Sequence, residues 1–247
     1  MASPKKPSNR KKSSASAAGW FRPSWRSIRL WLLRAMAGLI ALFAALILLF
    51  AFVPPPINFY QAAEYWRLGK IEKDWVGWDE IAPEMALSVV AAEDANFCLH
   101  WGFDMAAIRQ AISEGGGRGA STLSQQLVKN TFLWHGRNWV RKAAEATLTP
   151  VVELVWTKRR ILHVYLNVVE FDEGIFGVQT AARHYFGVDA KDLTALQSAR
   201  LAAVLPDPKG RDAANPSAFV RQRTRSIMAG AATIAVDGRA DCFAAQD

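Results

Sequence analysis

Three polar motifs within residues 93–145 organise this chain. They read EDANFCLHWGFD at positions 93–104, GASTLSQQLVKN at positions 119–130 and RKAAE at positions 141–145. Polar and charged side chains are seldom buried unless they are paired, so a set this dense contributes little to a hydrophobic core. Each residue alone would be an ordinary solvated helix face or turn. Together they indicate a functional site.

Helical spacing predicts that part of the second motif forms one surface. Thr122, Gln126 and Lys129 are four and three residues apart, so in a helix they share a face. Ser121 is expected to cap this helix, which should end near Phe132. The predicted face presents a hydroxyl, an amide and an ammonium group in a row.

Four basic residues lie close to the carboxylate of the third motif. They are Lys129, Arg137, Arg141 and Lys142, and the last two precede Glu145 by four and three residues. A lone helix-surface ion pair of this kind is worth only about 0.3–0.5 kcal/mol. Four cations leave positive charge that one carboxylate does not neutralise, and Arg and Lys side chains both suit phosphate oxygens. The pattern predicts a pyrophosphate-binding site.

Glu93 and Asp94 follow an apolar helical pattern that begins at Pro83. A carboxylate at the end of an apolar helix is a candidate for a raised pKa, as a general base working near neutrality requires. The alternative is an ordinary helix-end carboxylate in water. We interpret His100 as a structural histidine. The sequence contains no Walker loop, dinucleotide fingerprint, nucleophile elbow or His-Glu-x-x-His helix, so nothing points to a nucleotide or a protein-bound metal.

The positive charge of the chain is confined to its N-terminus. The net charge is +8, from 30 basic and 22 acidic residues, but nine basic residues fall in the first 34 positions and no acid precedes Glu64. The remaining 21 basic and 22 acidic residues nearly cancel. The basic balance therefore belongs to the tail and does not indicate a nucleic-acid partner.

Residues 35–53 contain no charge over 19 positions. As a helix this run would be about 28 Å long, close to the thickness of a bilayer's hydrocarbon core. A cleaved signal peptide would have a shorter apolar region and a small-x-small cleavage site, and a core helix would not be apolar on every face. We predict a single transmembrane anchor with a cytoplasmic N-terminus.

Five regions are expected along the chain. They are a disordered basic cytoplasmic tail at 1–34, a transmembrane helix at 35–53, a juxtamembrane segment at 54–80, the domain that carries the motifs at 81–235 and a C-terminal tail at 236–247. The aromatic residues of the juxtamembrane segment either form a collar at the bilayer or pack on the domain.

The domain is predicted to be mainly helical. No stretch shows sustained period-two alternation, so a large sheet is not expected. Helices are predicted at 104–113, 121–132, 138–166, 178–186, 193–205 and 218–235, with a kink or an interruption at Pro150. Cys98 and Cys242 lack metal-ligand spacing; two unpaired thiols are the favoured interpretation and a disulfide is the alternative.

The three motifs resemble those of the peptidoglycan glycosyltransferases, glycosyltransferase family 51. The resemblance continues through KRRILHVYLN at 158–167, GIFGVQTAA at 174–182 and YFG at 185–187, and it ends near residue 208. His163 departs from the family, which commonly has an acid at this position, but no catalytic role falls there. The last twenty or so residues resemble nothing in the family.

The resemblance implies a lysozyme-like helical domain in the monofunctional, membrane-anchored form. It implies that the enzyme polymerises lipid II: the growing glycan on undecaprenyl pyrophosphate is the donor, and the 4-hydroxyl of lipid II attacks with inversion. The substrates are then lipid II and the growing chain, in the bacterial inner membrane with the domain periplasmic. Other cell-wall synthesis or division proteins are further candidate partners.

The resemblance also implies roles for individual residues. Glu93 matches the general base, Asp94 its supporting acid and Glu145 a second glutamate near the leaving group. The positions around the donor pyrophosphate are matched by Lys129, Arg137, Arg141 and Lys142, and other donor contacts by Ser121, Thr122 and Gln126. No protein-bound cofactor is expected, although Mg or Mn assists members of the family.

Two other functions fit parts of the pattern. A membrane-bound muramidase on the same fold would cleave glycan instead of making it, yet a hydrolase has no use for four cations between its carboxylates. A catalytically silent scaffold for wall-building partners would need neither glutamate.

Overall fold

The computed structural model describes residue 3 and residues 24–115, 121–136 and 138–244. The chain divides into two compact units, residues 1–45 and residues 46–247. The first unit contains most of α1 (Trp25–Phe50), a helix of 26 residues with a mean hydropathy of 2.5 in its most apolar window. Within the described residues it is the one helix long and apolar enough to cross a membrane.

The bounds of α1 differ from the predicted anchor. The helix begins at Trp25, so the disordered tail predicted for 1–34 is wrong for residues 25–34, which are helical. Leu, Arg and Trp are acceptable helix residues, and a helix already formed in the apolar run extends into them at little further cost. The helix ends at Phe50, three residues before the predicted boundary at Val53.

The second unit is mainly helical, as predicted. Its α-helices are α2 (Phe59–Leu68), α3 (Pro83–Glu93), α4 (Met105–Ser113), α5 (Leu123–Phe132), α6 (Trp139–Val155), α7 (Lys158–Val168), α8 (Val178–Phe186), α9 (Ala195–Val204) and α10 (Ala218–Val236). Short 3-10 turns are η1 (Trp78–Glu80), η2 (Phe97–Leu99) and η3 (Ala190–Asp192). The three-stranded sheet is small: β1 (Glu72–Lys73) is parallel to β3 (Ile175–Phe176), which pairs antiparallel with β2 (Glu170–Asp172).

Helix caps explain most of these bounds. Asn138 caps α6 by accepting from the Arg141 N–H at 2.7 Å, and Pro83 occupies the first turn of α3, where its missing N–H is no loss. Of the two effects expected at Pro150, a kink or an interruption, the interruption does not occur, because α6 continues through it to Val155. The break comes at Trp156 and Thr157, whose hydroxyl caps α7.

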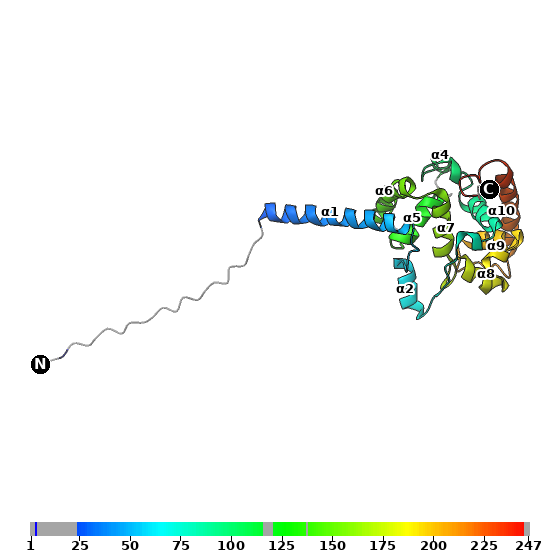
Figure 1. Cartoon of the computed structure of the whole chain (residues 1–247), viewed down its shortest axis with the longest axis horizontal. Helices are drawn as coiled ribbons and strands as arrows, with labels where there is room; N and C mark the ends of the chain where they lie inside the picture. The colour runs from blue at the N-terminus through cyan, green and yellow to red at the C-terminus, as the bar shows by residue number, and fades with distance from the viewer. Residues whose placement is uncertain (1–2, 4–23, 116–120, 137, 245–247) are drawn as a thin grey trace. The chain divides into compact units, whose positions relative to one another are not determined.

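Two helix groups form the core of this unit. Helices α3, α9 and α10 pack on one another, and α5 packs against both α6 and α7. In Figure 1, α9 and α10 lie at the end of the domain opposite α6. Met85 and Val89 of α3 and Leu123 and Leu127 of α5 are fully buried. The apolar sides of α3 and α5 are thus fixed, which also fixes the polar residues at the end of α3 and along α5.

The juxtamembrane segment contributes to this unit. Helix α2 has a complete capping box between Asn58 and Gln61, and Gln61 is buried. The Tyr60 hydroxyl donates to Glu170 of β2, whereas Trp66 is 85% exposed. Packing on the domain, one of the two alternatives, therefore holds for part of the segment.

Cys98 and Cys242 form a disulfide, so the favoured interpretation of unpaired thiols is wrong. Their Cα atoms are 5.6 Å apart although 144 residues separate them. Beyond α10 the chain returns to the turn η2, and the Phe243 side chain is buried there. Arg159 of α7 donates to the Phe243 carbonyl at 3.2 Å. The C-terminal segment is therefore packed on the domain as far as Ala244.

Candidate active site

Glu93 is the last residue of α3, at the point where the chain leaves the helix. Asp94 has a non-helical backbone (φ −162°, ψ 72°), which ends α3. The Glu93 side chain is only 12% exposed. Burial raises the pKa of this carboxyl; a hydrogen bond from Gln126 and the charges of three basic side chains act against the rise without cancelling it. A raised pKa is the property that the sequence pattern predicted for a general base.

A short hydrogen-bond chain orients the Glu93 carboxylate. The Tyr165 hydroxyl of α7 donates to Gln126 Oε1 at 3.1 Å, and Gln126 Nε2 donates to Glu93 Oε2 at 3.0 Å. Tyr165 is fully buried and therefore rigid. The contact with the Tyr165 hydroxyl fixes which end of the Gln126 amide faces Glu93. Three helices, α3, α5 and α7, thus define the position of one carboxylate.

Asp94 points away from these contacts and joins α3 to α5. Its Oδ2 accepts from the Leu123 N–H at 2.9 Å, at the first turn of α5, and its Oδ1 lies 2.9 Å from His100 Nε2. A carboxylate at a helix N-terminus satisfies a free N–H and interacts favourably with the helix dipole. Asp94 therefore fixes the start of the helix that carries Gln126. His100 serves this contact, which agrees with its structural interpretation.

Thr122 is not on the predicted polar face. It is the cap residue of α5, with an extended backbone (φ −75°, ψ 165°), so helical spacing does not apply to its side chain. Its hydroxyl is buried and donates to the Gly102 carbonyl at 2.6 Å. Gly102 has φ +79°, and a Cβ there would lie 2.6 Å from the Thr149 methyl group, so only glycine fits. Ser121, predicted as the cap, is instead exposed, and its Oγ lies 3.4 Å from Lys142 Nζ.

Glu145 lies on α6 and binds two cations. Its side chain is 3% exposed; Arg141 NH1 donates to Oε2 at 2.5 Å, and Lys142 Nζ donates to Oε1. Arg141 is further fixed because its Nε donates to the Gly136 carbonyl at 2.8 Å. The ion pairs that this local spacing allows are therefore formed, and they lie on a buried carboxylate instead of on a solvated helix surface.

Lys129 connects the two glutamates electrostatically. Burial lowers the pKa of its ammonium; Glu145 and Glu93 raise it, and Arg141 and Lys142 lower it further. Within the described part of the chain, no carboxylate lies within ion-pair distance of its Nζ. With Gln126 and Tyr60, Lys129 lines a cavity of about 210 Å³.

Basic groups act on the lining of this cavity, which also includes the Glu170 carboxylate. Burial lowers the pKa of His135, which lines the cavity, to about 4, and the charges of Lys129 and Arg141 add to the effect. Arg141 and Lys142 line a second, open hollow of about 270 Å³ with Asn138 and Trp139.

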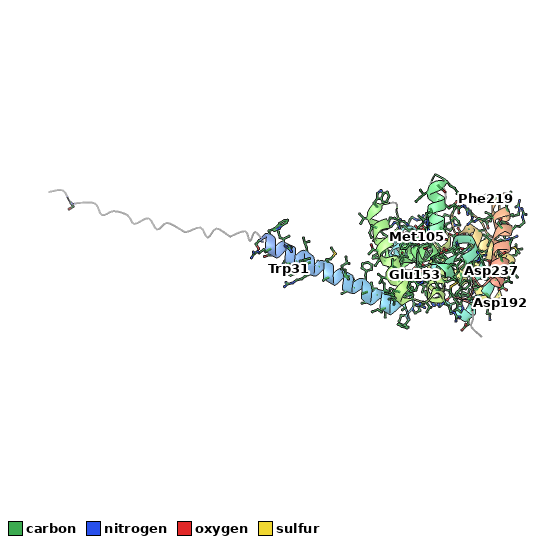
Figure 2. All side chains as sticks on the ribbon, turned by 90° about the horizontal axis from the view of Figure 1, so that it is seen from above. Trp31, Met105, Glu153, Asp192, Phe219 and Asp237 are labelled. Carbon is green, nitrogen blue, oxygen red and sulfur yellow. A yellow bond between two sulfur atoms is a disulfide. The ribbon has the colours of Figure 1, made fainter. Side chains whose placement is uncertain are left out.

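A second network of buried hydrogen bonds joins α5 to α6 and α7. Glu153 of α6, which Figure 2 labels, accepts from the Ser124 hydroxyl and from Lys158 Nζ, the latter at 2.8 Å. Lys158 Nζ also donates to the His100 carbonyl at 2.7 Å. These contacts hold α5, α6 and α7 together around the residues described above.

Sequence reasoning missed three residues near Glu93. Arg223 of α10 and Arg211 act on its pKa, and Tyr165 acts through Gln126. Tyr165 lies in the YLN motif, which was quoted without a role, whereas nothing local distinguishes Arg223 from its neighbouring arginines. Arg137 lies outside the described residues. Among the residues described, no group of three or more His, Cys, Asp or Glu side chains could hold a metal ion.

Two buried glutamates and a group of cations lie on a mainly helical domain, an arrangement whose chemistry suits proton transfer and the binding of an anion. Comparison with known proteins identifies the family of this domain. The family profile described as Transglycosylase matches residues 61–232. The chain therefore belongs to the transglycosylase family, and the predicted lysozyme-like helical fold is the fold of that family.

Relatives share most of their length with this chain. A biosynthetic peptidoglycan transglycosylase of Jannaschia sp. (strain CCS1) is 63% identical over 219 residues, 89% of this chain and 92% of the relative. A protein of the same name from Pectobacterium carotovorum is 52% identical over 209 residues, 80% and 86% of the two chains. One from Yersinia pestis is 50% identical over 210 residues, 80% and 87%.

Proposed function

We propose that this chain is a membrane-anchored peptidoglycan glycosyltransferase that polymerises lipid II into glycan strands in cell-wall synthesis. Membership of the transglycosylase family and relatives that carry this function in their names support the reaction class. In the proposed reaction the growing glycan on undecaprenyl pyrophosphate is the donor. The 4-hydroxyl of the incoming lipid II is the acceptor, and the anomeric centre inverts.

The charge around Glu145 is the observation that carries this proposal. Lys129, Arg141 and Lys142 bring three positive charges against the single Glu145 carboxylate, so two positive charges remain. A diphosphate diester brings two negative charges. Lys129 is also desolvated, so an anion reaching it gains more than it would at an exposed lysine.

Glu93 is suited to accept the proton of the acceptor hydroxyl. Its raised pKa makes the ionised carboxylate a stronger base than an exposed glutamate, and with Gln126 on Oε2 the buried Oε1 accepts no hydrogen bond among the described residues. As the acceptor oxygen bonds to the anomeric carbon, its proton passes to Glu93. The bond between the anomeric carbon and the pyrophosphate oxygen breaks, and its electron pair leaves with the pyrophosphate.

Glu145 holds the cations that receive the leaving group. Its two ion pairs direct the Arg141 guanidinium and the Lys142 ammonium, and Lys129 adds a third cation. Cations placed before the reaction stabilise the charge that develops on the leaving oxygen without reorganising. Ser121, close to Lys142, remains a proposed donor contact, as does Arg137. Thr122 and Asp94 act by fixing the start of α5.

A divalent cation would come with the donor. Mg²⁺ keeps several waters and is usually bound through substrate phosphates with one or two carboxylates. Mg or Mn on the pyrophosphate would supply further charge for the leaving group. The residues proposed to hold the pyrophosphate are basic, so we assign no protein ligand to the metal.

Helix α1 supports the proposed location. A single apolar helix near the N-terminus fits the single-pass anchor of a cell-wall enzyme. We propose that it crosses the bacterial inner membrane, with the basic N-terminus cytoplasmic and the domain periplasmic, where lipid II and the growing strand are reached. Other wall-synthesis or division proteins are proposed partners.

A purified full-length preparation given labelled lipid II alone tests the reaction. The expected result is long, lysozyme-sensitive glycan from the wild type and from Glu84→Gln, a change at an exposed residue of the same helix α3. Glu145→Gln is expected to make little polymer. Absence of polymer from the wild type overturns the proposal.

Two outcomes would favour the rival functions. Release of short glycan from finished cell wall, without polymer from lipid II, would indicate a muramidase. A cellular effect that survives Glu93→Gln would indicate a scaffold.

A further inference from the structure

Arg223 of α10 reaches the end of α3, far from it in sequence. Its NH2 group donates to the Ala92 carbonyl at 3.3 Å and lies 3.5 Å from Glu93 Oε1. Within the described residues, Glu93 Oε1 and Arg223 Nε are both buried atoms without a hydrogen-bond partner. A buried carboxylate oxygen and a buried guanidinium nitrogen, each unsatisfied, therefore belong to neighbouring side chains.

The packing of α10 explains this position. Ile227 and Ile234 are buried, and with Arg223 and Gly230 they recur at helical spacing on one face. A Cβ at Gly230 would lie 3.3 Å from Ala91 Cβ, so glycine allows α10 to approach α3 closely. The backbone that carries Arg223 is thus held against the backbone that carries Glu93.

The segment after α10 also contacts the residues that follow Glu93, at Ala95 and Cys98. Arg239 NH1 donates to the Ala95 carbonyl at 3.2 Å, and Arg239 is itself paired with Asp237, which Figure 2 labels at the end of α10. The Cys98–Cys242 disulfide follows. Residues 92–98 are therefore supported at three points by one continuous C-terminal segment, of which Arg223 is the part nearest to the carboxylate.

We propose that Arg223 is a positioning residue for Glu93, holding Oε1 by charge so that the carboxylate stays ionised while Oε1 keeps a lone pair that no hydrogen bond from the protein occupies. This inference rests on the proposed function. The two oxygens are held differently: Gln126 donates a hydrogen bond to Oε2, while at 3.5 Å Arg223 attracts Oε1 without forming one. The hydrogen bond from Arg223 to the Ala92 carbonyl keeps the guanidinium from moving closer to Glu93 Oε1.

Other groups near Glu93 also affect its pKa, and they remain unchanged in the variants tested below. Lys129 of α5 and Arg211, in the loop before α10, favour the ionised carboxylate, as does the Gln126 hydrogen bond. The buried Tyr165 hydroxyl of α7 lies within its electrostatic reach. Of the three cations, Arg223 has the largest effect on the carboxylate.

The pH profile of polymerisation by the full-length enzyme tests this role. The base must be ionised, so activity falls as the pH drops through the pKa of Glu93. Arg223→Gln removes the charge but can still donate to the Ala92 carbonyl. The pKa of Glu93 should therefore rise, and the acid limb of the pH profile (the side on which activity falls with decreasing pH) should move up by about 1 pH unit. On that limb the variant should be about tenfold slower than the wild type, and the gap should narrow as the pH increases.

Matched variants separate charge from structure. Arg225→Gln changes an exposed arginine two residues along α10 and should leave the acid limb in place. Arg223→Lys keeps the charge without the planar guanidinium; its limb should stay close to that of the wild type while kcat falls. If Arg223→Gln is too unstable to assay, Arg223→Lys decides the question, because a limb displaced by about 1 unit despite the retained charge contradicts the proposal.

The pH profiles test the role of Arg223 separately from the proposed glycosyltransferase function. An unmoved acid limb in folded Arg223→Gln, with active wild-type enzyme, overturns the role of Arg223 and leaves the glycosyltransferase assignment intact. A wild type that makes no polymer overturns the assignment itself.

Discussion

The two glutamates of the site are held in opposite ways. Glu145 is paired within its own helix, by Arg141 four residues and Lys142 three residues before it. Glu93 is contacted from α5 by Gln126, 33 positions away in sequence, and from α10 by Arg223, while Tyr165 of α7 acts on it through Gln126. A charge cluster that binds an anion can be built locally, because cations need only be near. A base needs a defined orientation and a shifted pKa, and only distant elements packed around it provide both.

Removal of the base should give the largest effect. Glu93→Gln keeps the shape of the side chain and can still contact Gln126, but it cannot take a proton. Polymerisation of lipid II should fall by about 10²-fold or more, the usual loss on removing a general base. The assay is initial rate of glycan formation, with Glu84→Gln as the control. Retention of a tenth or more of the activity would contradict the role of Glu93.

The desolvated cation comes next. Lys129→Gln removes an ammonium that has no carboxylate partner among the described residues, so donor binding should weaken by about 10- to 100-fold, as for a charge-assisted hydrogen bond. Titration with a non-polymerisable diphosphate-linked donor analogue measures it. Lys191→Gln, at an exposed lysine of η3, is the control and should bind normally. Equal affinities in Lys129→Gln and the wild type would remove the pyrophosphate site from this position.

The hydrogen-bond chain should have a smaller effect. Tyr165→Phe removes the hydroxyl that orients the Gln126 amide but preserves the buried ring. One lost hydrogen bond of about 1 kcal/mol corresponds to a few-fold fall in kcat. KM should hardly change, since Tyr165 is buried away from substrate. A change confined to KM would show that Tyr165 does not act through Glu93.

The disulfide should matter least for turnover and most for stability. Replacing Cys98 and Cys242 together by Ser opens a loop with a sequence separation of 144 residues. The free energy of unfolding should fall by about 2–4 kcal/mol, measured by denaturant titration of the full chain in detergent. Activity well below the melting transition should stay within about threefold of the wild type, because Arg223 and Arg239 still hold residues 92–98. A larger loss would make the disulfide part of the positioning of Glu93.

Local patterns in the sequence predicted much of this site, and the failures share a cause. The helices 178–186 and 218–235 and the pairs of Glu145 depend on neighbours within a turn or two, where spacing is informative. Spacing places Thr122 on the wrong face, because a cap residue has left the helical geometry that spacing assumes. Pro150 was expected to kink or interrupt α6, but the helix continues through it and ends where Thr157 caps the next one.

The sequence by itself determined a long apolar helix near the N-terminus, a mainly helical domain and a cluster of cations close to Glu145. These features depend on composition and on spacing within a few residues, and neither depends on which distant segments meet in the fold. The tertiary structure alone decided that Cys98 meets Cys242, that Asp94 caps α5 and that Arg223 faces Glu93. Each of these contacts joins residues 29 or more positions apart, and only the packing of α3, α5 and α10 around one core brings them together.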